Sequence, residues 1–585
     1  MCGIIGYIGE KVEENLLQGL ERLEYRGYDS AGMTINRGGE FVTYKATGKV
    51  ENLKKTLKFN DDLGMGIAHT RWATHGKICI ENCHPHFSSN GNVALVHNGI
   101  LENFEDLKAE LSKEGKYFYG QTDSEVIAKC FDRLDIKSLR RVLGKLQGSY
   151  ALALIAKDSD SIYFVKNKSP LYVGFNGSQA MVASDPSCFV GILTEYYTLE
   201  DGEYGRINKK EAVFYNKNNE KIEKYITKLD FKVSYEEKTG YDHFMIKEIY
   251  QSRIALENII ERYKQEEIIN KLKLLKNYEF DRTYLVGCGT AYHAGLIGGY
   301  YLREAFNVDV FCEIASEFRY KNLNIDDKSL CIFISQSGET ADTLSALEFC
   351  KEKGGKIVSI TNTEYSTIAR LSDICFPICA GQEKAVASTK AYFAQCLIFY
   401  IITTFLKGKD YILPLQNFKR QIDFGDDNIL KPLAKNLVKY DKVFFIGRGV
   451  DYITAKEASL KLKEITYIFS TAEASGELKH GVIALIDSSV PVIVIATDEK
   501  LFNKTLNNAY EIKSRGGKLI LFTSLQIDKD IKENFDYVIE VKKTSKEFQS
   551  LQMILPLQKL AYFTAIEKGN NPDMPRNLAK SVTVE

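Results

Sequence analysis

Tyr284-Leu-Val-Gly-Cys-Gly289 and Phe444-Phe-Ile-Gly-Arg-Gly449 open two similar stretches in the second half of the chain. Glu352-Lys-Gly-Gly-Lys-Ile-Val-Ser359 recurs as Ser514-Arg-Gly-Gly-Lys-Leu-Ile-Leu521, so the offsets from 284 to 444 and from 352 to 514 are 160 and 162 residues. Short apolar runs alternate here with longer helical patterns, which is typical of a parallel sheet covered by helices on both faces. The repeat therefore predicts two copies of one α/β unit. The second strands of the two copies are expected at Ser329–Ser335 and Val490–Ala496.

The first 235 residues have a different, β-rich pattern, with short apolar or alternating runs separated by glycines. Asn-Gly pairs at 90–91, 98–99 and 176–177 mark expected turns. Residues 209–232 are polar and rich in charge, and we interpret them as the end of this unit and the start of a linker. The strands expected in this half are Ile4–Ile8, Met65–His69, Val93–Val96, Ala151–Ile155 and Tyr163–Val165.

Length and composition exclude several classes of protein. The 585 residues predict three or four domains at about 100–200 residues each. The 77 basic and 77 acidic residues cancel, which excludes a globally basic nucleic-acid binder. No apolar run approaches the roughly 20 residues of a membrane span, and Met1-Cys2-Gly3-Ile4 lacks the basic region of a secretory signal. Twelve cysteines are too few for a disulfide scaffold, so we expect reduced thiols and a cytoplasmic protein.

Cys2 follows the initiator methionine and is a candidate nucleophile. Removal of Met1 would leave one residue carrying both a thiol and a free α-amine, which can act as a base near neutral pH. An inert cysteine near a terminus is the alternative, and position alone favours it. The motifs that follow Cys2-Gly3-Ile4 change that balance. They are Leu23-Glu-Tyr-Arg-Gly-Tyr-Asp-Ser-Ala-Gly32, His69-Thr-Arg-Trp-Ala-Thr-His75, His97-Asn-Gly99 and Thr122-Asp123.

These motifs resemble those of the class II (N-terminal nucleophile) glutamine amidotransferases over the first 240 residues or so. The resemblance implies an α+β glutaminase domain of αββα layers in which Cys2 attacks L-glutamine. It implies that the Asn98 side-chain amide and the Gly99 N–H stabilise the oxyanion, with Asn98-Gly99 in a tight turn. By the same resemblance, Arg71 binds the substrate carboxylate and Asp123 the ammonium. Residues that line the pocket or gate an internal ammonia passage are Arg26, Thr74, His75 and Trp72, the last being the gate.

Each of these residues has a plainer interpretation. Arg71 could be a surface ion-pair partner, Asp123 could be a helix N-cap, and Trp72, the only tryptophan, could be ordinary core. Five of the eight histidines lie at positions 69, 75, 84, 86 and 97, beside Cys79 and Cys83. Their spacing matches no standard zinc pattern, so we favour structural histidines over a metal site. We expect no metal and no cofactor.

The second candidate site begins at Ser335-Gln-Ser-Gly-Glu-Thr340, between an apolar strand and a helical pattern. Backbone N–H groups at a helix start and several hydroxyls suit a phosphate monoester, although ordinary helix capping is the alternative. The segment resembles the sugar isomerase (SIS) signature, and the repeats resemble the tandem SIS domains of the glucosamine-6-phosphate synthase family (glutamine–fructose-6-phosphate aminotransferase, isomerising). The phosphosugar-binding residues implied are Thr290, Ser335, Gln336, Ser337, Thr340, Val386 and Ser388. Ala291 stands where that family commonly has a serine.

Glu457, Lys461 and Glu464 are spaced to share one helix face, where an exposed ion-pair ladder is the plainer interpretation. The resemblance makes Glu464 the group that moves a proton between C1 and C2 of the sugar, with Lys461 as its charge partner. His480 would help to open the sugar ring from the neighbouring subunit, which implies a homodimer. Lys580, otherwise a solvated tail lysine, would form a Schiff base with the ketose.

The sequence thus predicts an enzyme that makes D-glucosamine 6-phosphate and L-glutamate from D-fructose 6-phosphate and L-glutamine, passing ammonia internally. An amidotransferase acting on another acceptor and a non-catalytic SIS sugar-phosphate sensor are the alternatives. No nucleic acid or membrane is expected as a partner. The expected divisions are a glutaminase domain at 2–225, a linker with lead-in helices at 226–270, doubly wound SIS domains at 271–415 and 434–575, and a tail at 576–585 that closes the sugar site.

Overall fold

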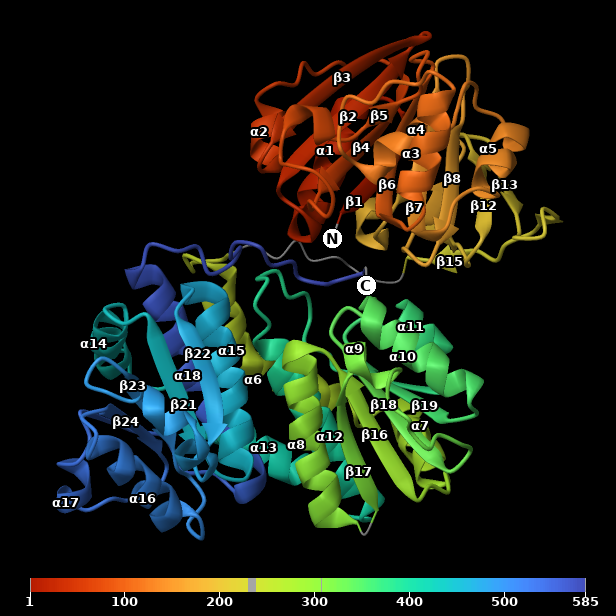
Figure 1. Ribbon diagram of the computed structural model, residues 1–585. Helices are drawn as coiled ribbons and strands as arrows, with labels where there is room; N and C mark the ends of the chain where they lie inside the picture. Colours follow the sequence, from red (N-terminus) through yellow and green to blue (C-terminus); the bar gives the residue numbers. More distant parts are fainter. Residues whose placement is uncertain (1, 230–237, 307, 584–585) are drawn as a thin grey trace. The chain divides into compact units, whose positions relative to one another are not determined.

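The computed structural model of the chain describes residues 2–229, 238–306 and 308–583 (Figure 1). The chain forms two compact units, one from residues before 236 together with residues from 581 on, and one from residues 236–580, and each is described by itself. The predicted removal of Met1, residues 230–237 of the expected linker and the last two tail positions lie outside the described residues.

The first unit contains two antiparallel sheets, ordered β15-β11-β9-β10-β1-β4-β2-β3 and β14-β13-β12-β8-β7-β6-β5. The strands of the eight-stranded sheet are β1 (Gly3–Gly9), β2 (Ser30–Arg37), β3 (Glu40–Thr47), β4 (Gly64–Arg71), β9 (Tyr172–Phe175), β10 (Ala180–Ala183), β11 (Glu195–Thr198) and β15 (Thr227–Lys228). Those of the seven-stranded sheet are β5 (His86–Phe87), β6 (Val93–Leu101), β7 (Gly148–Ala156), β8 (Ile162–Asn167), β12 (Glu203–Ile207), β13 (Ala212–Tyr215) and β14 (Lys221–Ile222). The helices are α1 (Val12–Leu23), α2 (Val50–Lys54), α3 (Phe104–Lys113), α4 (Asp123–Lys129) and α5 (Ile136–Leu143).

Side chains that alternate between the two faces of each strand pack the first unit into four layers. In β1, Ile5 and Tyr7 pack with α1 and α2, whereas Ile4 and Ile8 pack between the two sheets. Side chains of the other face of the seven-stranded sheet pack against α3, α4 and α5. Because successive residues of a strand point to opposite faces, each sheet contacts helices on one side and the other sheet on its second side. The αββα arrangement is therefore confirmed, and all five predicted strands form.

One prediction for this unit is wrong. Asn98-Gly99 is not a turn, because both residues lie inside β6, where Gly99 is paired with Tyr150 of β7. Turns do form at 90–91 and 176–177. In the stretch 209–232, interpreted as the end of this unit and the start of a linker, β13, β14 and β15 extend the two sheets as far as residue 228.

The second unit contains two parallel five-stranded sheets, ordered β17-β16-β18-β19-β20 and β22-β21-β23-β24-β25. The first comprises β16 (Arg282–Gly287), β17 (Asp309–Ile314), β18 (Ser329–Ser335), β19 (Lys356–Thr361) and β20 (Ile374–Pro377). The second comprises β21 (Lys442–Gly447), β22 (Phe469–Ala474), β23 (Pro491–Ile495), β24 (Lys518–Thr523) and β25 (Tyr537–Glu540). Both sheets have the strand order 2-1-3-4-5 of a doubly wound fold, so the predicted repeat is confirmed.

Helices cover and join these sheets (Figure 1). They are α6 (Phe244–Arg262), α7 (Glu266–Lys276), α8 (Gly289–Ala305), α9 (Ala315–Phe318), α10 (Ala341–Glu352), α11 (Thr367–Leu371), α12 (Lys390–Leu406), α13 (Ile412–Gln421), α14 (Asp427–Leu437), α15 (Val450–Thr466), α16 (Phe502–Lys513), α17 (Lys529–Lys532) and α18 (Lys546–Glu567). The long apolar run at 394–406 belongs to α12, which is buried against α8 and α6. The boundary expected at residue 271 lies within α7.

Gly99 is required by a close approach of two strands. Its φ is 129°, and a Cβ there would lie 2.0 Å from the carbonyl oxygen of Ser149. Gly91 also has a positive φ, 70°, but nothing lies within 4 Å of its Cβ position. We therefore expect Gly91→Ala to cost about 1 kcal/mol of unfolding free energy and Gly99→Ala to cost ~3 kcal/mol or more, from strain plus overpacking.

Urea unfolding followed by the emission of Trp72, the only tryptophan, measures both variants in this unit. Equal losses for the two glycines would contradict the steric argument.

Candidate active sites

Cys2 lies immediately before β1, which pairs with β4 on one side and β10 on the other. The register sets Gly3 opposite Thr70, so residue 2 meets the segment that follows β4. The backbone N–H of Trp72 donates to the Cys2 Sγ at 3.2 Å. Burial raises the pKa of the Cys2 thiol, although the Trp72 N–H and the charge of Arg71 oppose that shift. The thiol is therefore mainly protonated at neutral pH and needs a base before it can attack.

Asn98 lies beside the nucleophile. Its Nδ2 donates to the carbonyl oxygen of Cys2 at 3.0 Å, and its Oδ1 lies 3.1 Å from Nε2 of His69. Gly99 follows Asn98 in β6, with the unusual backbone described above. A side-chain amide donor thus lies against the residue that carries the thiol, and a glycine N–H follows it in the strand; these are the donor types that an oxyanion site requires.

Arg71 and Asp123 are both buried. The Arg71 guanidinium donates to backbone carbonyls of the loop after β4, to that of His75 and to that of Lys77 at 3.3 Å, so a surface ion pair is excluded. The Asp123 carboxylate accepts from the Leu101 N–H at 3.0 Å. The N-cap of α4 is Thr122, whose hydroxyl accepts from the Glu125 N–H at 3.2 Å, so the N-cap interpretation of Asp123 is wrong by one residue.

The other predicted pocket residues occupy more varied positions. Arg26 is buried and pairs with Asp185 at 3.4 Å. Thr74 is exposed and His75 is half-buried in the loop after β4. Trp72 is half-buried with its ring edge-on to Tyr28 at 5.6 Å, so ordinary core packing does not describe it.

Four histidines form a buried cluster that we call the histidine stack: His69, His84, His86 and His97. The rings of His69 and His84 stack at 3.9 Å, and those of His84 and His86 meet edge-on at 4.7 Å. His97 Nδ1 lies 2.9 Å from the Ser124 hydroxyl. Burial lowers the pKa of all four, to about 3 for His69, so the rings are neutral at neutral pH. In the described ranges no group of three or more His, Cys, Asp or Glu side chains is arranged to hold a metal ion.

This cluster predicts a stability of the first unit that depends on pH. The folded pKa values lie below the unfolded value of about 6.5, so the unfolded chain binds more protons below that pH. Stability is therefore complete above pH 6.5 and is lost as the pH falls, by up to about 1.4 kcal/mol per pH unit for each histidine. We expect the urea midpoint from Trp72 emission to fall between about pH 7.5 and 5.5. His86→Gln should reduce the slope, and a flat profile would contradict the buried neutral rings.

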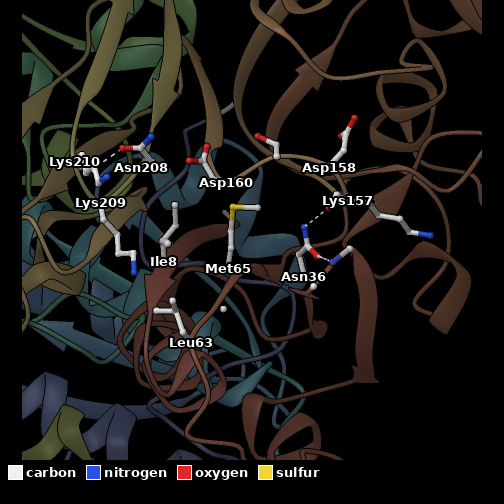
Figure 2. A pocket seen from close by; sticks show the side chains of 14 residues that line it. Ile8, Asn36, Leu63, Met65, Lys157, Asp158, Asp160, Asn208, Lys209 and Lys210 are labelled. Atoms are coloured by element: carbon white, nitrogen blue, oxygen red, sulfur yellow. Dashed lines mark hydrogen bonds between the residues drawn. The ribbon is translucent and has the colours of Figure 1, made fainter.

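A cavity of about 590 Å³ opens at the other end of β1, where Figure 2 shows Ile8 and Met65 at its wall. Lys157, Asp160 and Lys209 also line it. Ile8 is six residue steps along an extended strand from Cys2, a span of about 20 Å. The cavity therefore lies away from the nucleophile.

In the second unit, the segment 335–340 joins β18 to α10 as predicted. The Ser335 hydroxyl accepts from the Gly338 N–H at 3.0 Å and lies 3.0 Å from the Thr340 hydroxyl. The Ser337 hydroxyl accepts from the Glu339 N–H at 3.2 Å. β18 is paired with β16, at the point where the strand order reverses, and such a switch point is where doubly wound sheets bind ligands.

A cluster of buried charged side chains connects α8, which follows β16 of the first parallel sheet, with α15, which follows β21 of the second. Glu457 accepts from the Thr290 hydroxyl at 3.1 Å and from His293 Nδ1 at 2.7 Å. Lys461 Nζ lies 2.6 Å from Glu464 and 3.5 Å from Glu457, and it donates to Thr290 at 2.9 Å. Burial alone would lower the pKa of Lys461, but Glu464 and Glu457 raise it. The predicted exposed ladder is therefore wrong, because Glu457 and Lys461 are fully buried.

Lys580 is also buried, which excludes a solvated tail lysine. Its Nζ donates to Glu383 Oε2 at 2.5 Å, and the side chain is 3% exposed. Ser388 and the Thr389 N–H also donate to Glu383, each at 2.9 Å. Burial would raise the pKa of Glu383, but Lys580 and these hydrogen bonds lower it to about 2. Val386 lies in the same loop and donates its N–H to the carbonyl of Asp573 at 3.0 Å.

His480 ends the 3₁₀ turn Glu477–His480 and is exposed. His293 and Glu383, by contrast, contact predicted site residues but carry no sequence signal of their own. Their partners are 164 and 197 residues away in the chain, so only the fold reveals them.

Comparison with known proteins identifies the family. A glutamine amidotransferase domain model matches residues 70–191, and a SIS domain model matches residues 278–404 and 436–567. Curated proteins named glutamine–fructose-6-phosphate aminotransferase (isomerizing) match over 100% of this chain and 100% of their own length. Those of Fusobacterium nucleatum, Caldanaerobacter subterraneus and Thermococcus kodakarensis are 41%, 40% and 39% identical. The chain belongs to the glutamine–fructose-6-phosphate aminotransferase (isomerizing) family.

A solved member of this aminotransferase family also matches in structure. The C-terminal domain of glucosamine-fructose-6-phosphate aminotransferase from Francisella tularensis is 37% identical, with a TM-score of 0.53. The match covers 58% of this chain and 100% of that chain. In the chain described here, every helix within the described ranges is too short or too polar to span a membrane.

Proposed function

We propose that the chain converts L-glutamine and D-fructose 6-phosphate into L-glutamate and D-glucosamine 6-phosphate at two separate sites. The observation that carries this proposal is the buried Lys580, held on Glu383 beside the loop 386–388. An amine in such a position suits a ketose Schiff base. A sensor that only binds sugar phosphate would need neither this lysine nor the thiol of Cys2.

The first reaction is hydrolysis of glutamine. The α-amine of Cys2, freed by removal of Met1, takes the thiol proton, and the thiolate attacks the side-chain carbonyl carbon. Asn98 Nδ2 and the Gly99 N–H stabilise the oxyanion as ammonia leaves, and water then releases glutamate from the thioester. Arg71 binds the substrate carboxylate and Asp123 the ammonium, with Arg26, Thr74 and His75 around them.

The ammonia passes through the protein, gated by Trp72, to the second site. His480 of the neighbouring subunit opens the sugar ring, so the active protein is a homodimer. Lys580 first passes a proton to Glu383, and its neutral amine then adds to C2 and loses water to form an imine, which ammonia displaces to regenerate Lys580. Glu464, oriented by Lys461, moves a proton between C1 and C2 to give the amino aldose.

The phosphate binds where β16 and β18 end. Ser335, Ser337, Thr340 and Thr290 offer hydroxyl groups there, and Gln336, Val386 and Ser388 complete the contacts. No metal or redox cofactor takes part in the proposed chemistry. We also propose the domain division given above, with α7 counted in the first SIS domain. The twelve free thiols support a location in the reducing cytoplasm.

Cys2→Ala is expected to abolish glutamine-dependent formation of glucosamine 6-phosphate, by more than about 10³-fold, because no thioester can form. Isomerisation of fructose 6-phosphate to glucose 6-phosphate should continue, since it uses only the second unit. Cys130→Ala, which changes a half-buried thiol of the same unit, serves as the matched control and should retain both activities. Loss of isomerisation in the Cys2 variant would contradict two separable sites.

Borohydride is expected to trap fructose 6-phosphate on Lys580, because it reduces an imine to a stable amine. Peptide mass spectrometry should locate the adduct at residue 580 and find none in Lys580→Arg. That variant should still hydrolyse glutamine, and the exposed Lys568→Arg should behave as the unaltered protein. An adduct on another lysine would overturn the assigned role.

A further inference from the structure

His69 contacts the side-chain amide of Asn98, which is the predicted oxyanion donor. Its Nε2 lies 3.1 Å from Asn98 Oδ1 and 3.0 Å from the carbonyl oxygen of His97. Both partners are acceptors, so Nε2 must carry the proton. Nδ1 then carries the lone pair, and among the described residues this buried atom has no hydrogen-bond partner.

The orientation of the Asn98 amide decides whether it can serve as a donor. In the observed orientation, Nδ2 points to the Cys2 carbonyl and Oδ1 accepts from His69. Rotating the amide by 180° would place Nδ2 against the Nε2–H of His69 and Oδ1 against a carbonyl oxygen. Donor would then face donor and acceptor would face acceptor, and two buried groups would lose their partners.

We propose that His69 is a positioning residue for glutamine hydrolysis, whose Nε2–H holds the Asn98 amide with Nδ2 toward the reacting carbon. The inference rests on the proposed function of the Cys2 site. It concerns an interaction that must be in place before the oxyanion forms, because a donor fixed in advance costs no reorganisation during the reaction.

The histidine stack explains how the ring of His69 is itself held. The His84 ring stacks on it at 3.9 Å with an interplanar angle of 22°. The His97 N–H donates to His84 Nδ1 at 3.3 Å, which fixes the second ring. His86, next in the stack, lies 3.1 Å from the Thr122 hydroxyl. A protonated His69 is not needed, since burial keeps the ring neutral.

Three substitutions separate donation from packing. In His69→Gln the side-chain N–H₂ can reach the position of Nε2, whereas in His69→Asn it reaches only that of Nδ1. His69→Leu keeps apolar bulk without a donor. We expect Leu and Asn to lower kcat for glutamine hydrolysis about 10–100-fold, with KM within roughly twofold, because the loss of an oxyanion donor itself costs 10²–10³-fold. His69→Gln should recover most of the rate.

Binding of the γ-aldehyde analogue of glutamine gives a second readout. The analogue adds to the thiol and forms an oxyanion, whereas glutamate binds without one. In His69→Leu, we expect the aldehyde to bind more weakly by the same factor as the loss in kcat, with glutamate affinity unchanged. Phe164→Leu removes a buried ring of the same unit outside the stack and is the control for lost packing, so it should not weaken the aldehyde selectively.

A double-mutant cycle with Asn98→Ala completes the test. His69→Leu should have no further effect on kcat when Asn98 is absent, and additive losses would overturn the inference. A kcat unchanged in His69→Leu, or His69→Gln as impaired as His69→Leu, would also overturn it. Isomerisation of fructose 6-phosphate and Trp72 emission report whether each variant folds. If the unaltered protein itself does not hydrolyse glutamine, the proposed function fails rather than this inference.

Discussion

The pairing of β1 between β4 and β10 determines where the nucleophile lies. Because the strand is central and its register is fixed by buried side chains on both faces, Cys2 cannot move away from Trp72 without breaking two ladders. In the second unit the equivalent constraint is the reversal of strand order between β16 and β18, which brings Thr290 and the loop 335–340 to one sheet edge. Backbone pairing thus sets the position of each site in the fold, and the catalytic side chains project from these fixed strands and loops.

Polar side chains are buried in both units. The glutaminase side uses neutral histidines, whose lone pairs and N–H groups orient neighbours without charge. Both units also bury charged groups, which are Arg71 and Asp123 in the first unit and Glu457, Lys461, Glu383 and Lys580 in the second. Buried ion pairs seldom add net stability, since desolvation offsets the attraction. We therefore interpret these ions as groups retained for chemistry, each satisfied by several hydrogen bonds.

Much of the fold follows from local pattern. The two Gly-x-Gly stretches mark strand ends, and their offset predicts the repeat because similar motifs at a constant offset are typical of a duplicated unit. The strand position of Asn98-Gly99 could not be predicted from local pattern, because the glycine is required by the closeness of β7 and not by a turn. His293 and Glu383 could not be predicted either, because the residues that give them meaning are distant in sequence. The residue roles implied by the family stay predictions.

The central claim is that nitrogen released at Cys2 is delivered inside the protein to a sugar held by Lys580. The most direct measurement supplies glutamine labelled with ¹⁵N in its amide together with excess unlabelled ammonium, and reads the isotope in the product by mass spectrometry. We predict that glucosamine 6-phosphate carries ¹⁵N almost completely. Product nitrogen with the isotope composition of the surrounding ammonium would contradict the account.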